Sequence, residues 1–460
     1  MMVTVNVSSE LMAARAAYIL RANDLGELTT AAPRLYPHLW SWDAAFVAVG
    51  LATISVPRAI AELRTLLRAQ WRTGMLPHIV FGPDTSYFPG ADVWDSARAD
   101  AAPRGVATSG ICQPPVHAVA VRRILDAGRR NGGADQVAAE QFVAGTFDQW
   151  LAWYRWLATA RDPARRGLIE IYHSWESGMD NSPRWDSAYA NIVPGADLLT
   201  RPRHDVHHVT DAGQRPTDAD YRRYLWLVHQ MRSARYDDDR VRDTVDFRMT
   251  DVFMSAVAAV AAEELAGVGE ELGRLPEARE LRGLADRCRA GVLSTVSART
   301  GLARDQDLRT GAWLEVDSVA GFAALLCGGD EAVVEGQLRL LAGPQWCGHP
   351  GLRFAVPPSV PPASPGFAPR TYWRGPQWPM MNWLLWWALE RQRPGGELAV
   401  RIRAEALRQL ADLSFGEYYE PFTGEPLGST QQSWSAAVAL DWLLCPHGQP
   451  ALAGAGPGGR

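Results

Sequence analysis

Apolar residues recur along this chain with the spacing of one face of an α-helix. Residues 274–291 place apolar side chains at i, i+3, i+4 and i+7 and charged ones on the opposite face, with Pro276 in the first turn and Gly291 at the end. Residues 58–70 repeat the pattern. By contrast, residues 251–267 are apolar almost all round, which predicts a helix buried inside a ring of others.

Segments of this kind predict about a dozen helices. They cover residues 8–23, 43–53, 58–71, 114–131, 137–160, 220–233, 250–266, 275–290, 315–327, 331–342, 377–392, 396–412 and 430–444. The polar and aromatic residues gather between these helices. The pattern therefore favours an all-α toroid, in which inner and outer helices alternate and the loops at one end form a pocket.

Four long polar connections lie between the predicted helices, over residues 72–113, 161–219, 343–376 and 413–429. Structureless loops beyond ~15 residues are uncommon in compact domains and are usually functional. The Pro-rich stretch 354–369 resembles a domain linker, but we interpret it as a rigid loop because the best-defined chemistry of the chain follows it directly.

These connections indicate one folded unit with insertions. We expect a single domain over residues 1–446, in which insertions near 72–113 and 161–219 form a cap over the pocket. Residues 447–460 are rich in Gly, Pro and Ala, which predicts a disordered tail.

Composition narrows the class of protein. The 460 residues are 47% apolar and 21% charged, as in ordinary globular proteins, and the formal net charge of -5 disfavours nucleic acid or anionic membrane as a partner. The N-terminus lacks the features of a signal peptide, and no stretch reaches the ~18 consecutive apolar residues of a membrane span. Five widely spaced cysteines without a CxxC indicate neither a disulfide framework nor a zinc site. We expect a soluble cytoplasmic protein.

Four aromatic clusters lie in or beside the long connections, at residues 35–46, 174–186, 371–383 and 415–434. Each mixes Trp or Tyr with acids or amides, and the chain holds 19 Trp in all. An isolated Trp is more often part of a core, but acids beside it are costly there unless every polar group is satisfied. Aromatic rings stack on sugar rings while polar neighbours bind the hydroxyls, so the clusters predict a carbohydrate pocket.

Glycoside hydrolysis needs one protonated and one ionised carboxyl group. Asp180 and Glu417 are candidates, each in a Gly-flanked aromatic loop, and burial among Trp175 and Trp185 would favour the protonated form of Asp180. Either carboxylate could instead be structural, because acids at loop starts often cap helices. Chemistry alone leaves other carboxylates of the same loops open: Glu176, Asp186, Glu420 and Glu425.

The histidines of the segment "RHDVHHV" do not predict a metal site. His204, His207 and His208 have no supporting Cys or carboxylate spacing, so solvated loop histidines are the better interpretation. The chain also lacks GxxxxGK[ST], HExxH and GxSxG. These motifs therefore predict no metal site and no cofactor site.

The aromatic clusters and their flanks resemble glycoside hydrolase family 63, in particular its bacterial group of glucosylglycerate and mannosylglycerate hydrolases. The matching segments, in the family's order, are "LYPHLWSWDAAFVAVGLA", "QWRTGMLPHIVF", "SGICQPPVHA", "YHSWESGMDNSPRWDSAYAN", "YWRGPQWP" and "EYYEPFTGEPLGSTQQSW". The likeness runs from near residue 10 to about residue 445. Gln377 departs from it, because a small apolar residue is expected within "YWRGPQWP".

The resemblance implies an (α/α)6 barrel and an inverting mechanism without a metal. It assigns the general acid to Asp180 and the general base to Glu417. The implied substrate is a small glycoside, 2-O-α-D-glucosyl-D-glycerate, and the preference for the gluco or the manno form depends on a single hydroxyl.

Matching positions imply two subsites. The glucose contacts are Trp42, Asp43, Gln113, Trp175, Tyr372, Trp373, Trp378 and Gln432. The glycerate contacts are Arg215, Tyr221, Tyr36, Trp40 and Tyr87. Glycerate carries a carboxylate, which calls for a cation and hydroxyl donors in its subsite.

Three other functions stay open from the sequence. Another α-glycosidase such as a trehalase would not need Arg215, a non-catalytic sugar-binding protein would bind without turnover, and a helical scaffold would bury its tryptophans away from any cavity. The helix faces show no interface-specific patch, so the sequence is compatible with a homo-oligomer and does not establish one.

Overall fold

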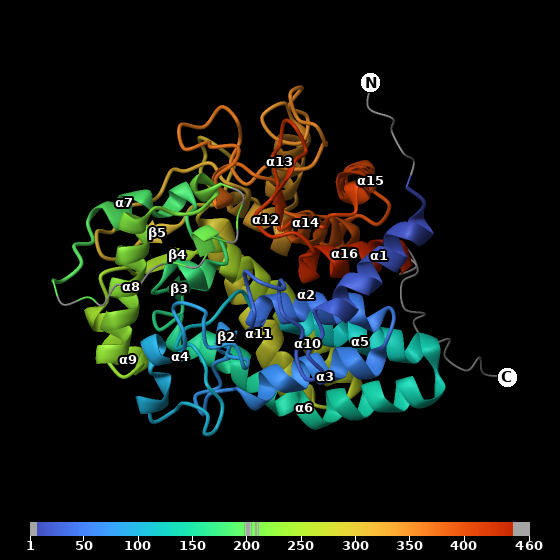
Figure 1. The fold of residues 1–460 in the computed structure, drawn as a ribbon, viewed down its shortest axis with the longest axis horizontal. Helices are drawn as coiled ribbons and strands as arrows, with labels where there is room; N and C mark the ends of the chain where they lie inside the picture. The colour runs from blue at the N-terminus through green and yellow to red at the C-terminus, as the bar shows by residue number, and fades with distance from the viewer. Residues whose placement is uncertain are drawn as a thin grey trace.

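Helices make up most of the computed structural model, which describes residues 7–196, 198, 203, 205–207, 209 and 211–444 (Figure 1). The helices are α1 Ser9–Ala22, α2 Ser41–Ala52, α3 Val56–Arg68, α4 Ala91–Trp94, α5 His117–Asn131, α6 Gly133–Ala160, α7 Asp186–Ala190, α8 Asp218–Ser233, α9 Asp238–Thr244, α10 Val252–Glu271, α11 Leu275–Ser294, α12 Ala323–Cys327, α13 Glu331–Ala342, α14 Pro379–Gln392, α15 Glu397–Gln409 and α16 Ser433–Leu444. The tail predicted over 447–460, and His204 and His208, lie outside the described residues.

Side-chain caps define where several helices begin. Ser8 and Ser55 each accept a backbone N–H from the first turn of α1 and α3. Thr217 and Asp220 form a reciprocal capping box at the start of α8, and Asp251 accepts two backbone N–H groups at the start of α10. These starts lie within a few residues of the predicted ones.

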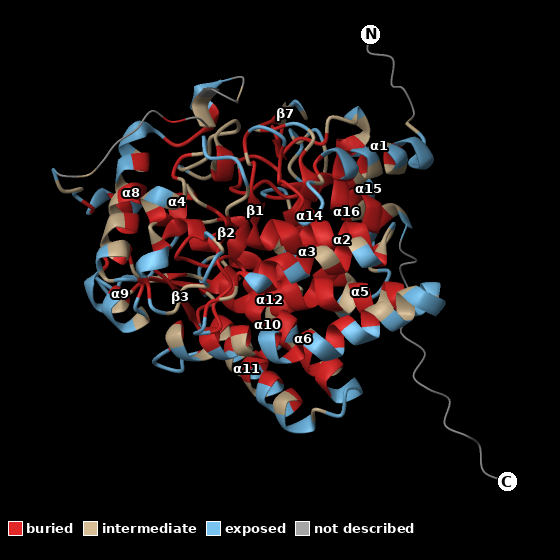
Figure 2. Ribbon diagram, turned by 60° about the horizontal axis from the view of Figure 1, so that its bottom comes forward, coloured by how far each residue is buried: buried red, intermediate tan, exposed pale blue. Residues whose placement is uncertain are grey.

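Six helices contact one another in a closed series. α2 packs against α5, α5 against α10, α10 against α12, α12 against α14, α14 against α16, and α16 against α2. Each carries a partner helix: α3 on α2, α6 on α5, α11 on α10, α13 on α12, α15 on α14 and α1 on α16. Figure 2 shows buried residues filling α2, α10 and α16, whereas α3, α6 and α11 turn exposed residues outward.

Helix α10 is largely buried in this series. By length and composition it is apolar enough to cross a membrane, but 83% of the relevant window is buried inside the protein. It packs against α5, α6, α11 and α12, so its apolar surface serves the core, as the all-round apolar pattern of 251–267 predicts.

Close helix packing also depends on a glycine in α2, all of whose residues are buried. A Cβ at Gly50 would lie 2.6 Å from the Cβ of Ala437 in α16. The missing side chain therefore lets the two backbones approach.

The beginning and the end of the described chain are joined by hydrogen bonds. Asn23, directly after α1, donates to the Ser433 Oγ at 2.8 Å and to the Gln431 carbonyl at 2.9 Å. The Ser433 N–H donates to the Ala31 carbonyl at 2.9 Å. These bonds hold the start of α16 against the loop that follows α1.

Seven short strands among the described residues amend the expected all-α class to a predominantly helical one. They are β1 Leu39–Trp40, β2 Ile79–Val80, β3 Ile169–Ile171, β4 Met249–Asp251, β5 Gln306–Asp307, β6 Tyr418–Tyr419 and β7 Pro426–Leu427. All pairings are antiparallel, in the orders β1-β2, β3-β4-β5 and β6-β7. In register, Leu39 faces Val80 and Tyr418 faces Leu427, so the strands tie the long loops to one another.

Three short helices were not predicted either: α4, α7 and α9. The charged segment 235–240 leads into α9, and Asp237 accepts the Arg240 N–H there. The acidic residues of this segment lie at the N-terminus of α9, where negative charge is stabilised by the positive end of the helix dipole. In Figure 1, α4, α7, α8 and α9 gather on one side of the molecule.

Candidate active site

A pocket opens where the loops between the core helices meet. Counted with its open mouth, the empty space is about 720 Å³. Its walls are Tyr36, Trp40, Trp42, Asp43, His78, Ile79, Tyr87, Pro89, Gln113, Trp175, Gly178, Asp180, Arg215, Pro216, Tyr221, Tyr224, Tyr372, Glu417, Gln432 and Trp434. The start of α2, the strands β1 and β2, and the start of α16 thus meet around one space.

Every predicted site residue except Trp373 and Trp378 lines this pocket. These two rings stack face to face, with centroids 3.8 Å apart and planes 3° apart. Trp378 also lies edge-on to Tyr372 at 5.1 Å, and the Trp373 N–H donates to the Asn181 side chain at 2.9 Å. They back the wall that Tyr372 forms, and their direct contact with a sugar stays a prediction.

Glu417 is fully buried and held by hydrogen bonds. Its Oε1 accepts the Tyr36 hydroxyl at 2.8 Å, and its Oε2 accepts the Ser429 N–H at 3.1 Å. Burial raises the pKa of Glu417 above its usual range, although the charge of Arg215 and the bonds from Tyr36 and Ser429 oppose the rise. The carboxylate is therefore oriented and remains a usable base.

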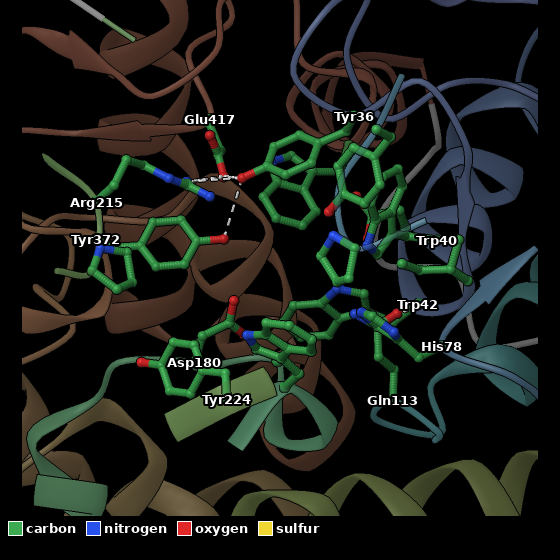
Figure 3. Close-up of a pocket in the computed structure, with 18 of the residues that line it drawn as sticks. Tyr36, Trp40, Trp42, His78, Gln113, Asp180, Arg215, Tyr224, Tyr372 and Glu417 are labelled. Atoms are coloured by element: carbon green, nitrogen blue, oxygen red, sulfur yellow. Dashed lines mark hydrogen bonds and ion pairs between the residues drawn. The ribbon is translucent and has the colours of Figure 1, made fainter. Parts of the chain in front are cut away.

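Asp180 faces Glu417 across the pocket (Figure 3). Among the described residues, the hydrogen bond found for its carboxyl group comes from its own backbone N–H, so the group can still meet a ligand in the pocket that it lines. Burial raises the pKa of Asp180 to about 7, the charge of Arg215 opposes this rise, and the charge of Glu417 adds to it. A carboxyl group with this pKa can carry a proton near neutral pH.

The other carboxylates weighed from the sequence have structural partners. Glu176 pairs with Arg161 at 2.8 Å, and both side chains are buried. The remaining three are occupied as follows: Asp186 pairs with Arg374, Glu425 pairs with Arg370, and Glu420 accepts backbone N–H groups of its own turn. Of the six, Asp180 and Glu417 line the pocket.

Asp43 is a third carboxyl group in the pocket wall, in the first turn of α2. Burial raises its pKa well above the usual range, and the charges of Glu417 and Asp180 add to the rise. This environment favours the neutral form of Asp43, which suits its carboxyl group to hydrogen bonding with a ligand rather than to acting as the base.

Arg215 is the cation nearest the two facing carboxyl groups among the described residues. Its Nη1 donates to the Tyr36 hydroxyl at 2.9 Å and lies 3.8 Å from the Glu417 Oε1. Its guanidinium lies over the Tyr372 ring, 4.3 Å from the centroid. An arginine in this position offers N–H donors to an anionic group in the pocket.

Comparison with known proteins settles the class of this site. The profile of a family described as the mannosylglycerate hydrolase MGH1-like glycoside hydrolase domain matches residues 36–435. The chain belongs to this family. It is a glycoside hydrolase, and its resemblance to glycoside hydrolase family 63 is confirmed.

Individual relatives cover nearly the whole chain. The chain is 55% identical over 437 residues to the glucosylglycerate hydrolase of Mycolicibacterium hassiacum, covering 94% of this chain and 97% of that protein. It is 38% identical over 433 residues to the mannosylglycerate hydrolase of Thermus thermophilus, covering 93% and 99%. A crystal structure of a family 63 mannosylglycerate hydrolase from Thermus thermophilus, in complex with Tris, superposes with a TM-score of 0.85 at 36% identity, covering 94% and 99%.

Several wall residues of this glycoside hydrolase were missed by sequence reasoning, among them His78, Tyr224 and Trp434. His78 lies within the matching segment "QWRTGMLPHIVF", directly before β2. Tyr224 follows Tyr221 by one helical turn, and Trp434 lies at the start of α16 beside Gln432. Helical spacing from an assigned residue could therefore have indicated Tyr224.

Three of the wall side chains hold buried nitrogens without a hydrogen-bond partner among the described residues: His78 Nδ1, Gln432 Nε2 and Trp434 Nε1. Burial lowers the pKa of His78 to about 3, so its ring is neutral. Unpaired buried donors are costly, and a ligand rich in hydroxyl groups would satisfy them.

Gln377, the departure from the family pattern, lies outside the pocket wall and is fully buried. Its Nε2 donates to the carbonyls of Phe354 and Val356, and its Oε1 accepts from Gln409 at 2.8 Å. Gln377 therefore braces the Pro-rich loop 354–369, which agrees with the rigid-loop interpretation.

Metal-ligating side chains do not gather in the described part of the chain. Within those ranges, no group of three or more His, Cys, Asp or Glu side chains could hold a metal ion.

Proposed function

We propose that this glycoside hydrolase cleaves 2-O-α-D-glucosyl-D-glycerate to glucose and D-glycerate with inversion at the anomeric carbon. The arrangement of Asp180 and Glu417 on opposite sides of a pocket that also contains Arg215 is the observation that carries the proposal. The 55% identity to a glucosylglycerate hydrolase supports the same substrate.

In the proposed mechanism Asp180 is the general acid and Glu417 the general base. Glu417 takes a proton from a water molecule, whose oxygen attacks the anomeric carbon. Asp180 gives its proton to the bridging oxygen as the bond to glycerate breaks. Because the water attacks the face opposite the leaving group, the α-glycoside yields β-glucose.

The side chains divide into two subsites under this proposal. Those near Trp42, Asp43 and Gln432 bind glucose, and the unpaired Gln432 Nε2 supplies a donor for a hydroxyl group. Arg215 binds the glycerate carboxylate, helped by hydroxyl donors from Tyr36 and Tyr87. Trp175 extends the aromatic wall for the sugar ring, and it stacks near His78 at 6.1 Å.

The proposal extends to the fold. We infer that the closed series of six helices and their six partners is an (α/α)6 barrel within a single domain over residues 1–446. The insertions near 72–113 and 161–219, which contain α4 and α7, form the cap. We further propose that the enzyme acts in the cytoplasm on a small-molecule substrate and without a metal or cofactor.

Mannosylglycerate is the second candidate substrate. The relatives at 38% identity include mannosylglycerate hydrolases of Thermus thermophilus and Selaginella moellendorffii. Glucose and mannose differ at one hydroxyl group, so one changed hydrogen bond in the sugar subsite decides the preference.

Proton NMR of the purified enzyme with each glycoside tests the proposal. The expected first product from the glucoside is β-glucose, and the relative initial rates rank the two substrates. Initial α-glucose would overturn the roles given to Asp180 and Glu417. No release from either glycoside would overturn the assigned substrate and the carboxylate role of Arg215.

A further inference from the structure

The segment "RHDVHHV", interpreted from sequence only for its histidines, contributes a different pair of residues to the site. Arg203 donates two hydrogen bonds to Asp205, from Nε to Oδ1 at 3.0 Å and from Nη2 to Oδ2 at 2.7 Å. The same Oδ2 accepts the Arg215 Nε at 3.2 Å. Asp205 therefore lies between two guanidinium groups, one of which belongs to the pocket wall.

Arg203 fixes this pair to the backbone beside the pocket. Its Nη1 donates to the Pro216 carbonyl at 2.7 Å, and its guanidinium lies 4.2 Å from the centroid of the Tyr221 ring. The side chains of Arg203 and Asp205 are 7% and 10% exposed. Because a planar fork pairs best with a carboxylate when both are shielded from water, the Arg203 and Asp205 pair is a firm support.

The other edge of the Arg215 guanidinium lies close to Glu417, the proposed general base. Its Nη1 bonds to the Tyr36 hydroxyl, and that hydroxyl donates to Glu417. The Arg215 and Glu417 charges are 3.8 Å apart in a buried setting, where opposite charges attract strongly. Without another carboxylate on its Nε, Arg215 would move onto Glu417 and occupy the oxygens that must accept a proton.

We propose that Asp205, held by Arg203, is a positioning residue that draws Arg215 away from Glu417 and leaves its guanidinium free to bind the leaving group. One cation then serves two purposes: it steadies Tyr36 on the base and it receives the glycerate carboxylate. The second purpose rests on the proposed function. Asp205 is not part of the pocket wall, so it acts through Arg215.

The proposal predicts how Asp205→Asn changes the kinetics. Arg215 pairs more closely with Glu417 in this variant, so the KM for glucosylglycerate rises about tenfold or more and kcat falls. A closer cation also lowers the pKa of Glu417, so the acidic limb of the pH profile of kcat/KM moves down by about one pH unit. If Asp205 had a purely structural role, Asp205→Asn would lower the stability of the folded enzyme and leave the acidic limb in place.

A double-variant cycle in the full-length enzyme tests whether Asp205 acts through Arg215. Kinetics are measured for the wild type, Asp205→Asn, Arg215→Met and the double variant. The expected result is that Asp205→Asn has no further effect once Arg215 is replaced. Independent, multiplying effects in the double variant would overturn the proposal, as would wild-type kinetics in Asp205→Asn.

Asp218→Asn is the matched control, because Asp218 also pairs with Arg203, at 3.1 Å, but its side chain is 89% exposed to solvent. We expect its KM and pH profile to equal those of the wild type. Should Asp205→Asn give little folded enzyme, Arg203→Lys serves in its place, because it keeps the charge but loses the planar fork. It should raise the KM and move the acidic limb of the pH profile down, as Asp205→Asn does. An inactive wild type would overturn the proposed function, whereas an active wild type with unaffected variants would overturn only the role of Asp205.

Discussion

The Tyr36 hydroxyl donates a 2.8 Å hydrogen bond to the Oε1 of Glu417. Tyr36 in turn accepts from Arg215, so the candidate base is held in place by a chain of donors that begins at a cation. Asp180 across the pocket receives no such support from the described residues. The two carboxyl groups thus have different surroundings, as an acid and a base at the same pH require.

Replacing the facing carboxyl groups should abolish most turnover while the fold persists. We expect Asp180→Asn and Glu417→Gln each to lower kcat by about 10²–10⁴-fold, because each removes one proton transfer. Initial-rate kinetics and thermal unfolding give the two readouts. The controls are Asp186→Asn and Glu425→Gln, which change exposed carboxylates of the same loops and should keep near-normal rates.

The pH profile of kcat/KM should be bell-shaped. The basic limb is expected near pH 7, because Asp180, whose pKa burial raises to about 7, must be protonated to act as the acid. The acidic limb reports Glu417, which must be ionised and therefore loses activity as the pH falls through its raised pKa.

Glu417→Gln gives a further check on this assignment. The negative charge of Glu417 adds to the raised pKa of Asp180, so its removal should move the basic limb of the residual activity to lower pH. A basic limb that stays in place would contradict the assignment of that limb to Asp180.

Arg215 should discriminate between substrates that differ only in charge. Glucosylglycerate and 2-O-α-D-glucosylglycerol have the same sugar, but the second has a hydroxymethyl group in place of the carboxylate. We expect Arg215→Met to lower the ratio of their kcat/KM values by about 100-fold or more, because a buried charge-assisted pair is lost. For Arg215→Lys, which keeps the charge but not the planar fork, this ratio should lie between those of the wild type and Arg215→Met. An unchanged ratio would mean that the glycerate carboxylate binds to a residue other than Arg215.

Gly178 should tolerate no side chain. It has a φ of +70° in the loop that carries Asp180, and a Cβ there would lie 2.5 Å from the Trp42 ring. Gly178→Ala should therefore displace Trp42 or Asp180 and lower kcat/KM by about 10–100-fold. Gly26→Ala is the control for backbone strain alone, because Gly26 has a φ of +92° with open space around it. Equal activity losses in both variants would contradict a packing cause.

Helical periodicity predicted the core because it is a local property of the chain. The all-round apolar pattern of residues 251–267 predicted α10, and each predicted helix has a counterpart in the structure. The short strands were missed because two or three residues are too few to show alternation. Strands such as β1 and β2 form only because distant loops meet, which no local pattern records.

The candidate site was predicted mainly through its resemblance to known sequences. Aromatic and acidic clusters indicated a sugar pocket, but the choice of Asp180 over Glu176 depends on a partner: Glu176 is neutralised by Arg161, which precedes strand β3 in the chain. His78 was missed because a single His beside a short strand resembles an ordinary core residue. Contacts between segments decide such cases, and the sequence alone does not show them.

The hydrogen bond that joins Asn23 to Ser433 spans 410 positions, and the bond from Tyr36 to Glu417 spans 381. A ribosome must therefore deliver nearly the whole described chain before the last core helix can dock. Loop closure over such distances is slow, and apolar surfaces of early helices such as α2 stay exposed until it happens. Asp180 lies on an earlier loop, and Glu417 is synthesised more than 200 residues later, so the two facing carboxyl groups come together only in a late step of folding.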